Sequence, residues 1–505
     1  MKKIISLFLI IIIILSLFSC SKNSANISSN IKVSSNQTNA NLPFVLACIS
    51  GEQLHPILAK SNTNKQLLKL CYDGLIRLSN SFEAENIIAN KVTQNGNSFT
   101  FEIKSNALFW DGSPITAEDI AYSFLIAKDS VSSYYTKFKY IYSFSAQENT
   151  FTVNTNSTAK RNINLFDIPI IKKNSDLNGN IPIGSGRYVL SNDKGQYSLK
   201  ANDKWIMGLL PKISNIKITE IPDMNTLFHT FNSGSIGAVY ADLNSSTAAY
   251  YGNIELKEFT TNIISFLGVN YSKDYLLDKR IRRGLSLAIN RTLLTSEILL
   301  SHSEPIWHPF NPKWKEILST ELPKDKYSKE EAIILFEEAG FAKDNNGKRA
   351  IFGKPVTLNI VVNSDNRFRL DATNRIADNF KKLDINVTVT ALSSNEYNNA
   401  LNAKDFDLFF GEVKIPDNMD ISVLGEPLVN KGGWDYNVLT KIINDFDSGA
   451  TGIDEAIFAF EDETPFIPLY YNNSALAISR NVIGNILPVQ NDIFGGIETW
   501  SLSNN

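Results

Sequence analysis

Residues 356–410 read VTLNIVVNSDNRFRLDATNRIADNFKKLDINVTVTALSSNEYNNALNAKDFDLFF, and this stretch decides the fold class. Alternating apolar residues predict three strands, at 356–362, 385–389 and 407–410. Apolar residues at helical spacing predict one helix through 375–383, and the capping box of Ser393 and Glu396 predicts a second helix. Strands that alternate with helices at this spacing are typical of an α/β fold with a mainly parallel sheet.

The regular pattern also indicates where a ligand would bind. Upstream, Ser328 and Glu331 fit a capping box before an amphipathic helix that Gly340 would end. In parallel sheets ligands bind beyond the carboxyl ends of the strands. Attention therefore falls on residues 411–420, which directly follow the third strand.

The first half of the chain has less regular elements. Apolar patterns predict strands at 42–49 and 99–103, and an amphipathic helix over 65–77. Residues 110–114, WDGSP, have the chemistry of a tight turn, and Thr116 is suited to cap the helix that follows.

Composition and charge restrict the class of protein. The chain has 505 residues, of which 43% are hydrophobic and 20% charged, as expected for a folded protein of two to four domains. The formal net charge is −3 and no long basic run occurs, which argues against a nucleic-acid-binding protein. Three cysteines cannot build a disulfide scaffold. Cys48 and Cys71 each lie in an apolar run, which favours buried thiols, although a disulfide between them stays open.

The first 20 residues predict export and lipidation. Residues 1–19 have two lysines followed by an apolar run too short to span a membrane, which is typical of a signal peptide. Leu17 to Cys20, LFSC, resembles a bacterial lipobox, with Phe18 bulkier than the motif usually has. We expect Cys20 to be acylated and residues 20–41, rich in Ser and Asn, to act as a flexible tether. The alternative is an ordinary secretory signal with an incidental cysteine.

No motif in the sequence requires catalysis. The four histidines are scattered and form no HExxH pair, and there is no CxxC, P-loop or nucleophile elbow. We therefore predict a protein that is not an enzyme and has no metal or cofactor.

Six dispersed motifs together resemble the dipeptide and oligopeptide-binding lipoproteins of ABC importers, the family 5 extracellular solute-binding proteins. In chain order they are 70–75 (LCYDGL), 99–120 (through FWDGSPITAEDI), 183–188 (IGSGRY), 268–291 (GVN, then DKRIRRGLSLAINR), 335–341 (LFEEAGF) and 465–470 (PFIPLY). Arg187 stands where the family usually has proline. Asp278, with Arg280, Arg282 and Arg283 after it, is also expected on physical grounds as a capped and solvated helix start.

The resemblance implies a two-lobed periplasmic-binding-protein fold of the second type with an extra subdomain. Lobe I would be discontinuous, with an inserted subdomain at 74–180 and lobe II at 263–467. The three segments of lobe I would be 42–73, 181–262 and 468–505. Two crossovers between the lobes would form a hinge that encloses the ligand.

The resemblance also implies the function of a receptor. A monomer anchored on the outer face of the bacterial cytoplasmic membrane would capture a small solute, expected to be an oligopeptide, and deliver it to an ABC permease with its ATPase subunits. Other ligands of the same fold (a sugar, nickel or haem) stay open, and a surface hydrolase is a more distant alternative.

The ligand-binding residues are the least determined part. In peptide-binding relatives an aspartate in this region holds the amino terminus of the peptide. Here residues 411–418 read GEVKIPDN, so that position carries Ile415 or is deleted, and Asp417 and Asp420 are the carboxylates that could compensate. Such a departure argues against an ordinary amino-terminal anchor unless another carboxylate replaces it. The candidates for cleft residues are Glu52, Gln53, Tyr135, Glu412, Lys414, Asp417, Asp420, Trp434, Tyr470 and Tyr471.

Overall fold

The fold is described from a computed structural model, in which residues 43–503 are described except 245–249, 426–430 and 434–436. The predicted signal peptide, Cys20, the tether and Trp434 lie outside the described residues. In the described part of the chain, no helix has the length and apolar character that crossing a bilayer requires.

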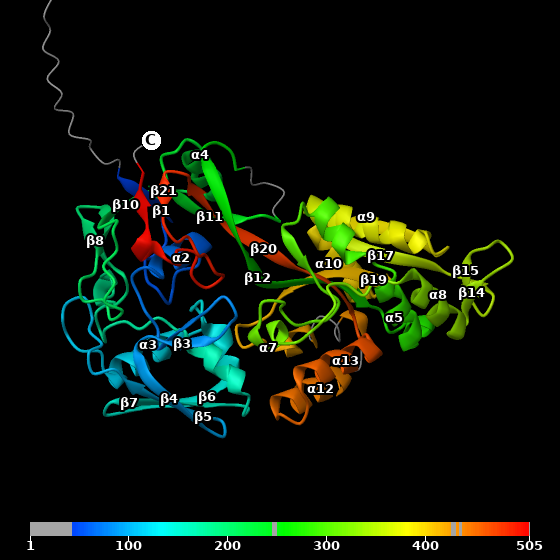
Figure 1. Cartoon of the computed structure of the whole chain (residues 1–505), viewed down its shortest axis with the longest axis horizontal. Helices are drawn as coiled ribbons and strands as arrows, with labels where there is room; N and C mark the ends of the chain where they lie inside the picture. The colour runs from blue at the N-terminus through cyan, green and yellow to red at the C-terminus, as the bar shows by residue number, and fades with distance from the viewer. Residues whose placement is uncertain (1–42, 245–249, 426–430, 434–436, 504–505) are drawn as a thin grey trace, which may run out of the picture. The chain divides into compact units, whose positions relative to one another are not determined.

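The largest sheet is built around two long antiparallel strands, β12 (Ile254–Val269) and β20 (Ile467–Ser479), which run side by side in Figure 1. Its strand order is β11-β20-β12-β19-β17-β18, and β13 pairs with β20 on the edge opposite β12, which β11 also uses. The other strands of this sheet are β11 (Ala238–Asp242), β13 (Ser303–Pro305), β17 (Thr357–Asn363), β18 (Asn386–Leu392) and β19 (Leu408–Lys414).

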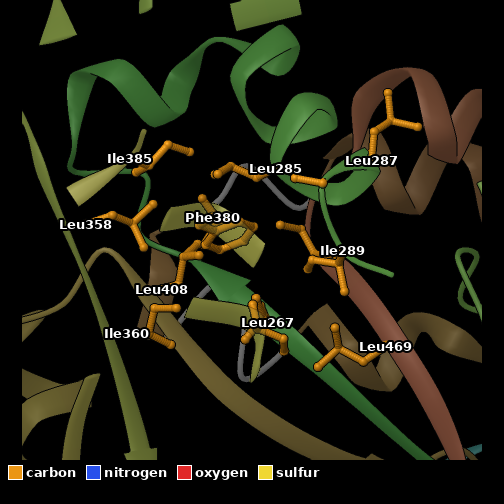
Figure 2. Close-up of a cluster of buried hydrophobic side chains, with 14 of the residues drawn as sticks. Leu267, Leu285, Leu287, Ile289, Leu358, Ile360, Phe380, Ile385, Leu408 and Leu469 are labelled. Carbon is orange, nitrogen blue, oxygen red and sulfur yellow. The ribbon is translucent and has the colours of Figure 1, made fainter. Parts of the chain in front are cut away.

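The strand and helix run predicted over 356–410 is confirmed. β17 pairs in parallel with both β18 and β19. The intervening helices are α9 (Arg367–Lys381), which Asn366 caps, and α10 (Ser394–Ala403), which begins with the predicted capping box of Ser393 and Glu396. Phe380 of α9 lies in the middle of a buried cluster that includes Leu358 and Ile360 of β17, Leu408 of β19 and Leu285 of the helix at 279–287, as Figure 2 shows.

A second sheet begins with the first described strand and packs against the C-terminal segment. Its order is β1-β10-β9-β8, with β1 (Phe44–Ile49) parallel to β10 (Asn215–Ile221), followed by β9 (Gln196–Ala201) and β8 (Tyr188–Asp193). The C-terminal segment carries β21 (Val482–Ile483) and β22 (Ser501–Leu502), and its Trp500 ring packs edge-on against Phe44, with ring centroids 6.3 Å apart. Cys48 and Cys71 lie in this core as buried free thiols, as predicted.

A third sheet has a separate hydrophobic core. Its order is β4-β5-β7-β6, with β4 at Ala89–Asn95, β5 at Ser98–Ile103, β6 at Ile141–Gln147 and β7 at Thr150–Thr155. Phe99 and Phe101 of β5 both pack on Phe166. α3 (Ala117–Ala127) covers this core and begins at Thr116, which caps it as predicted together with Asp119. The buried members of this core come from residues 57–170, with Ile183 and Ile206 packed against them, and the domain boundaries given above stay a prediction.

The helix predicted over 65–77 is wrong in its second half. α2 covers only Asn62–Leu68, and the chain then forms β2 (Ile76–Leu78), which pairs with β3 (Ala84–Asn86). The backbone carbonyls of Leu70 and Cys71 instead accept hydrogen bonds from the Tyr188 and Gly186 amides, both at 2.9 Å. Pairing with this distant segment therefore overrides the local helical pattern.

The remaining elements complete the α/β part. The helices are α4 (Met224–Asn232), α5 (Lys279–Leu287), α6 (Arg291–Leu293), α7 (Lys315–Leu318), α8 (Lys329–Glu338), α12 (Asn437–Asp447) and α13 (Ile453–Glu463). A small sheet contains β14 (Phe341–Lys343), β15 (Arg349–Ile351) and β16 (Lys354–Pro355). α8 is capped by Ser328, as predicted, and Gly340 follows it with a φ of 73°.

α5 begins at Asp278, as predicted, but its start is not solvated throughout. The Asp278 side chain accepts a hydrogen bond from the Arg280 amide at 2.9 Å. Arg282, by contrast, is buried and donates to the carbonyls of Thr464 and Leu276, both at 3.0 Å. The expectation of a solvated arginine is therefore wrong, because this guanidinium ties α5 to the chain that enters β20.

Arg187, the departure from the family motif, forms a buried ion pair. Its Nη2 lies 2.5 Å from Oδ2 of Asp492, and its Nη1 donates to the Phe494 carbonyl at 3.2 Å. Both charged side chains are buried, so each relies on the other for compensation. The pair joins the start of β8 to the C-terminal segment.

We expect Arg187→Met to destabilise the protein by about 3 to 5 kcal/mol, because it leaves Asp492 buried without its cation. Arg187→Met with Asp492→Leu should recover most of that loss, since neither charge is then left alone. Urea unfolding followed by circular dichroism measures both, with the exposed Lys381→Gln as a control. Equal stability of wild type and Arg187→Met would contradict the assigned role.

Asp73 is a second buried acid in the same region. Its Oδ2 accepts a hydrogen bond from the Trp205 indole at 2.9 Å. Burial raises the pKa of Asp73 to about 6, although Arg187 and the bond from Trp205 act in the opposite direction. The folded protein thus holds this proton at pH values where an unfolded aspartate has lost it.

Stability from protonated Asp73 should be fully present below about pH 4 and lost as the pH rises through about 6. Asp73→Asn, which can still accept from Trp205, should therefore stabilise the protein at pH 7.5 by at most about 3 kcal/mol. At pH 4 the gain should vanish. Urea unfolding at both pH values measures the gain in the free energy of unfolding, with Asp193→Asn at an exposed position as the control. A gain that is the same at both pH values would contradict the raised pKa of Asp73.

Candidate functional site

The pairing of β12 with β20 is interrupted in the middle of both strands. Thr260 faces Asn473, and the next pair is Ile264 with Tyr471, so three residues of β12 stand opposite a single residue of β20. Such a bulge bends the strand and turns side chains away from the regular alternation. Thr261 and Ile263, two residues of the bulge, line a cleft.

Side-chain amides hold the bulge in place. The backbone N–H of Asn262 donates to Oε1 of Gln490, and the side-chain oxygen of Asn262 accepts from the side-chain amide of Asn311 at 2.7 Å. The Asn262 carbonyl accepts from the Ile415 amide at 2.8 Å. The bulge is thereby joined to the C-terminal segment and to the chain that follows β19.

The cleft has a volume of about 300 Å³. Its lining comes from α2, from the predicted subdomain, from β11 and β12, from the end of β19 and from the C-terminal segment. The lining residues are Asn62, Lys65, Gln66, Lys69, Ser133, Tyr134, Lys137, Asp167, Tyr240, Phe259, Thr261, Ile263, Lys414, Asp417, Gln490 and Asn491. Segments far apart in the sequence therefore converge on one polar cavity with three aromatic rings in its wall.

A charged network occupies one wall of the cleft. The Lys137 ammonium contacts carboxylate oxygens of both Asp167 and Asp417, the latter at 2.9 Å. Lys69 lies 3.7 Å from the other oxygen of Asp167. Although burial alone would raise it, Lys137 and Lys414 lower the pKa of Asp417, so its carboxylate is ionised near neutral pH. Oδ1 of Asp417 is buried and has no hydrogen-bond partner among the described residues.

Side chains of the predicted subdomain form hydrogen bonds with the segment that contains Asp417. The Tyr140 hydroxyl donates to Asp420 at 2.7 Å. Arg161 donates to the Asn418 carbonyl at 2.6 Å and forms a forked ion pair with Asp447. These bonds fix residues 418–420 against the predicted subdomain.

Of the residues predicted from the sequence, the structure brings Lys414 and Asp417 into the cleft lining. Lys414 is the last residue of β19, so the lining includes the carboxyl end of a strand that pairs in parallel with its neighbour. The roles of both residues in binding stay predictions.

The other described candidates lie outside this lining. Glu412 pairs with Arg369 and accepts from Ser265 and Asn472, and Asp420 caps the turn at Ser422. Tyr470 and Tyr471 are buried in two different cores, and Tyr135 is half exposed. Glu52 accepts from Ser61 and Asn64 at the start of α2, while Gln53 is exposed.

Most of the lining was not predicted from the sequence. Lys65 and Lys69 lie four residues apart on and just after α2, a spacing that places two cations on one side of a helix. That spacing could have identified these two lysines as a pair of cations in the sequence. Lys137, Asp167 and Gln490 meet only through tertiary contacts, and no local pattern marks them.

Other sites in the structure are less suited to a solute. A larger and more open hollow of about 610 Å³ lies on the third sheet, lined within a short stretch of that sheet by residues such as Glu102, Lys104 and Asn149. Over the described ranges, no three His, Cys, Asp or Glu side chains are grouped as metal ligands would be. The cleft at the crossing strands is therefore the candidate site.

Comparisons with known proteins agree with this architecture. Residues 53–434 match the family model for bacterial extracellular solute-binding proteins, family 5. The oligopeptide-binding protein AppA of Bacillus subtilis (strain 168) is 23% identical, and the alignment covers 99% of this chain and 98% of the relative.

Solved structures show the same fold. The murein tripeptide-binding protein MppA in its unliganded open form has a TM-score of 0.76 at 18% identity, covering 92% of this chain and 98% of that one. A nickel ABC transporter protein from Bacillus halodurans has a TM-score of 0.75 at 17% identity, covering 91% and 100%. The predicted two-lobed binding-protein fold is confirmed, and the chain belongs to the family 5 bacterial extracellular solute-binding proteins.

Proposed function

We propose that this protein is a membrane-anchored receptor that captures an oligopeptide in the cleft at the crossing strands and delivers it to an ABC permease. The observation that carries the proposal is the cleft itself, where three separate parts of the chain meet around the bulge of β12. The match to family 5 and the similarity to named oligopeptide-binding proteins support it.

The geometry suits capture by enclosure. β12 and β20 both pass from one hydrophobic core to the next, so a change in their bend at the bulge would move the two sides of the cleft. The contacts of Arg161 and Lys137 with the segment 415–420 would break when the cleft opens. A receptor of this kind acts as a monomer and needs no catalytic residue.

The lining suits a peptide. The side-chain amides of Asn62, Gln490 and Asn491 offer donors and acceptors that match backbone groups of an extended chain. Tyr134 and Tyr240 supply aromatic surface for peptide side chains.

We expect mixtures of tri- to pentapeptides to raise the melting temperature of the soluble body, residues 41–505. A ligand at about 100 times its Kd contributes roughly 2.7 kcal/mol, a shift of a few degrees for a protein of this size. Differential scanning fluorimetry measures the shift, with oligosaccharides, nickel and haem as competing classes.

A cleft-filling variant makes this test specific. Asn62→Trp should abolish the shift because the indole occupies the cleft, whereas Asn215→Trp, at an exposed position of β10, should keep it. A shift with sugars or nickel alone would overturn the peptide assignment. Release of cleaved peptide, detected by mass spectrometry, would instead favour the hydrolase.

The anchor is tested separately. We expect the full-length protein to enter the detergent phase of a Triton X-114 partition and Cys20→Ser to remain in the aqueous phase, because two acyl chains hold a protein stably at a membrane. Ser24→Ala in the predicted tether is the control. Detergent partition of Cys20→Ser equal to that of wild type would favour the ordinary secretory signal.

A further inference from the structure

The cleft is positively charged although the protein as a whole is not. Its lining contains Lys65, Lys69, Lys137 and Lys414 but only Asp167 and Asp417 as acids. Four positive and two negative charges leave +2 in the cleft, whereas the full chain carries −3. A local excess of one sign inside a cleft with low-dielectric walls concentrates ligands of the opposite sign.

The two aspartates are already paired with the protein's own cations. Lys137 lies between Asp167 and Asp417, and Lys69 reaches the second oxygen of Asp167. A ligand ammonium would have to displace Lys137 or share Asp417 with it. In a partly buried site that rearrangement places two cations against one carboxylate, which is unfavourable.

Lys65 and Lys414 are the cations left over. Among the described residues neither has a carboxylate within ion-pair distance. Burial lowers the pKa of Lys65, and the charges of Lys414 and Lys60 lower it further, with Glu52 offsetting this in part. The oxygens of Glu52 are already occupied by Ser61 and Asn64. A bound anion would relieve the repulsion between these lysines.

The side-chain amide of Gln490 also favours a ligand that brings oxygen atoms into the cleft. The side-chain nitrogen of Gln490 is buried and has no acceptor among the described residues, while the oxygen of the same amide accepts from Asn262. A ligand oxygen would satisfy this donor, and a ligand N–H would not.

We propose that the ligand is anionic, an oligopeptide recognised through its carboxylates by Lys65 and Lys414 and not through its amino terminus. This inference rests on the proposed function for the peptide part, while the charge of the cleft requires only a carboxylate-bearing solute. Oδ1 of Asp417 remains available to a neutral backbone N–H, which does not bring a second cation.

The test uses the soluble body and isothermal titration calorimetry. The probes are pentapeptides of alanine and glutamate, their counterparts with glutamine or lysine in place of glutamate, and acetylated and amidated forms of each. We expect the glutamate peptides to bind roughly tenfold or more tightly than the glutamine peptides, since each charge-assisted bond is worth that much. Acetylation should change the affinity less than twofold, and raising the salt should weaken binding.

Matched variants locate the effect. Lys65→Gln and Lys414→Gln should each reduce the affinity for glutamate peptides roughly tenfold and bring it close to that for glutamine peptides. Lys128→Gln and Lys200→Gln, which remove the same charge from exposed positions, should leave it unchanged. Melting temperatures of all four variants show whether each is folded.

The outcomes separate the two proposals. Peptides of every charge binding equally well, or an affinity that acetylation abolishes, would overturn the anionic ligand and leave the peptide receptor in place. Binding of a non-peptide polycarboxylate such as citrate, lost in Lys65→Gln while no peptide binds, would support the anionic ligand and overturn the peptide receptor. No binding of any of these probes would overturn both.

Discussion

The pairing of β12 with β20 is the constraint on which the rest of the structure depends. Phe259 of β12 and Leu476 of β20 belong to the core that holds both chain ends, whereas Leu267 and Leu469 belong to the core under α9. The same two strands thus contribute to two separate hydrophobic cores, and the backbone hydrogen bonds between the strands join these cores. The bulge at Thr261–Ile263 lies between these cores, where the ladder of the two strands is interrupted and bending breaks few backbone hydrogen bonds.

The location of the cleft follows from that bulge. A strand with regular alternation would present Thr261 and Ile263 to the same face as their neighbours two residues away, and the wall of the cleft would be continuous sheet. The extra residues turn this part of β12 toward α2 and the C-terminal segment, and Asn262 and Asn311 hold the turn. The charges come from elements that do not pair with each other as strands, so the cleft holds both the paired cations Lys69 and Lys137 and the cations Lys65 and Lys414, which form no ion pair among the described residues.

How much was predictable depends on whether a feature is local. The run at 356–410 and the cap at Thr116 follow from period and capping chemistry, and both were predicted. The end of α2 was not, because hydrogen bonds from residues 186–188 decide it. For the site, the strand end predicted Lys414 and Asp417, but Lys137 and Gln490 come from loops and turns hundreds of residues apart. Their meeting is a property of topology, which one-dimensional patterns do not contain.

The position of β20 also governs how the protein can be made. This strand lies between β11 and β12, yet its residues 467–479 are among the last to be synthesised. Until these residues have been synthesised, β11 and β12 each have an unpaired edge toward β20, and Arg187 has no ion pair with Asp492. As the chain is synthesised, β12, β19, β17 and β18 can pair before β20 exists, but β11 and one edge of β12 stay open to aggregation until β20 is complete.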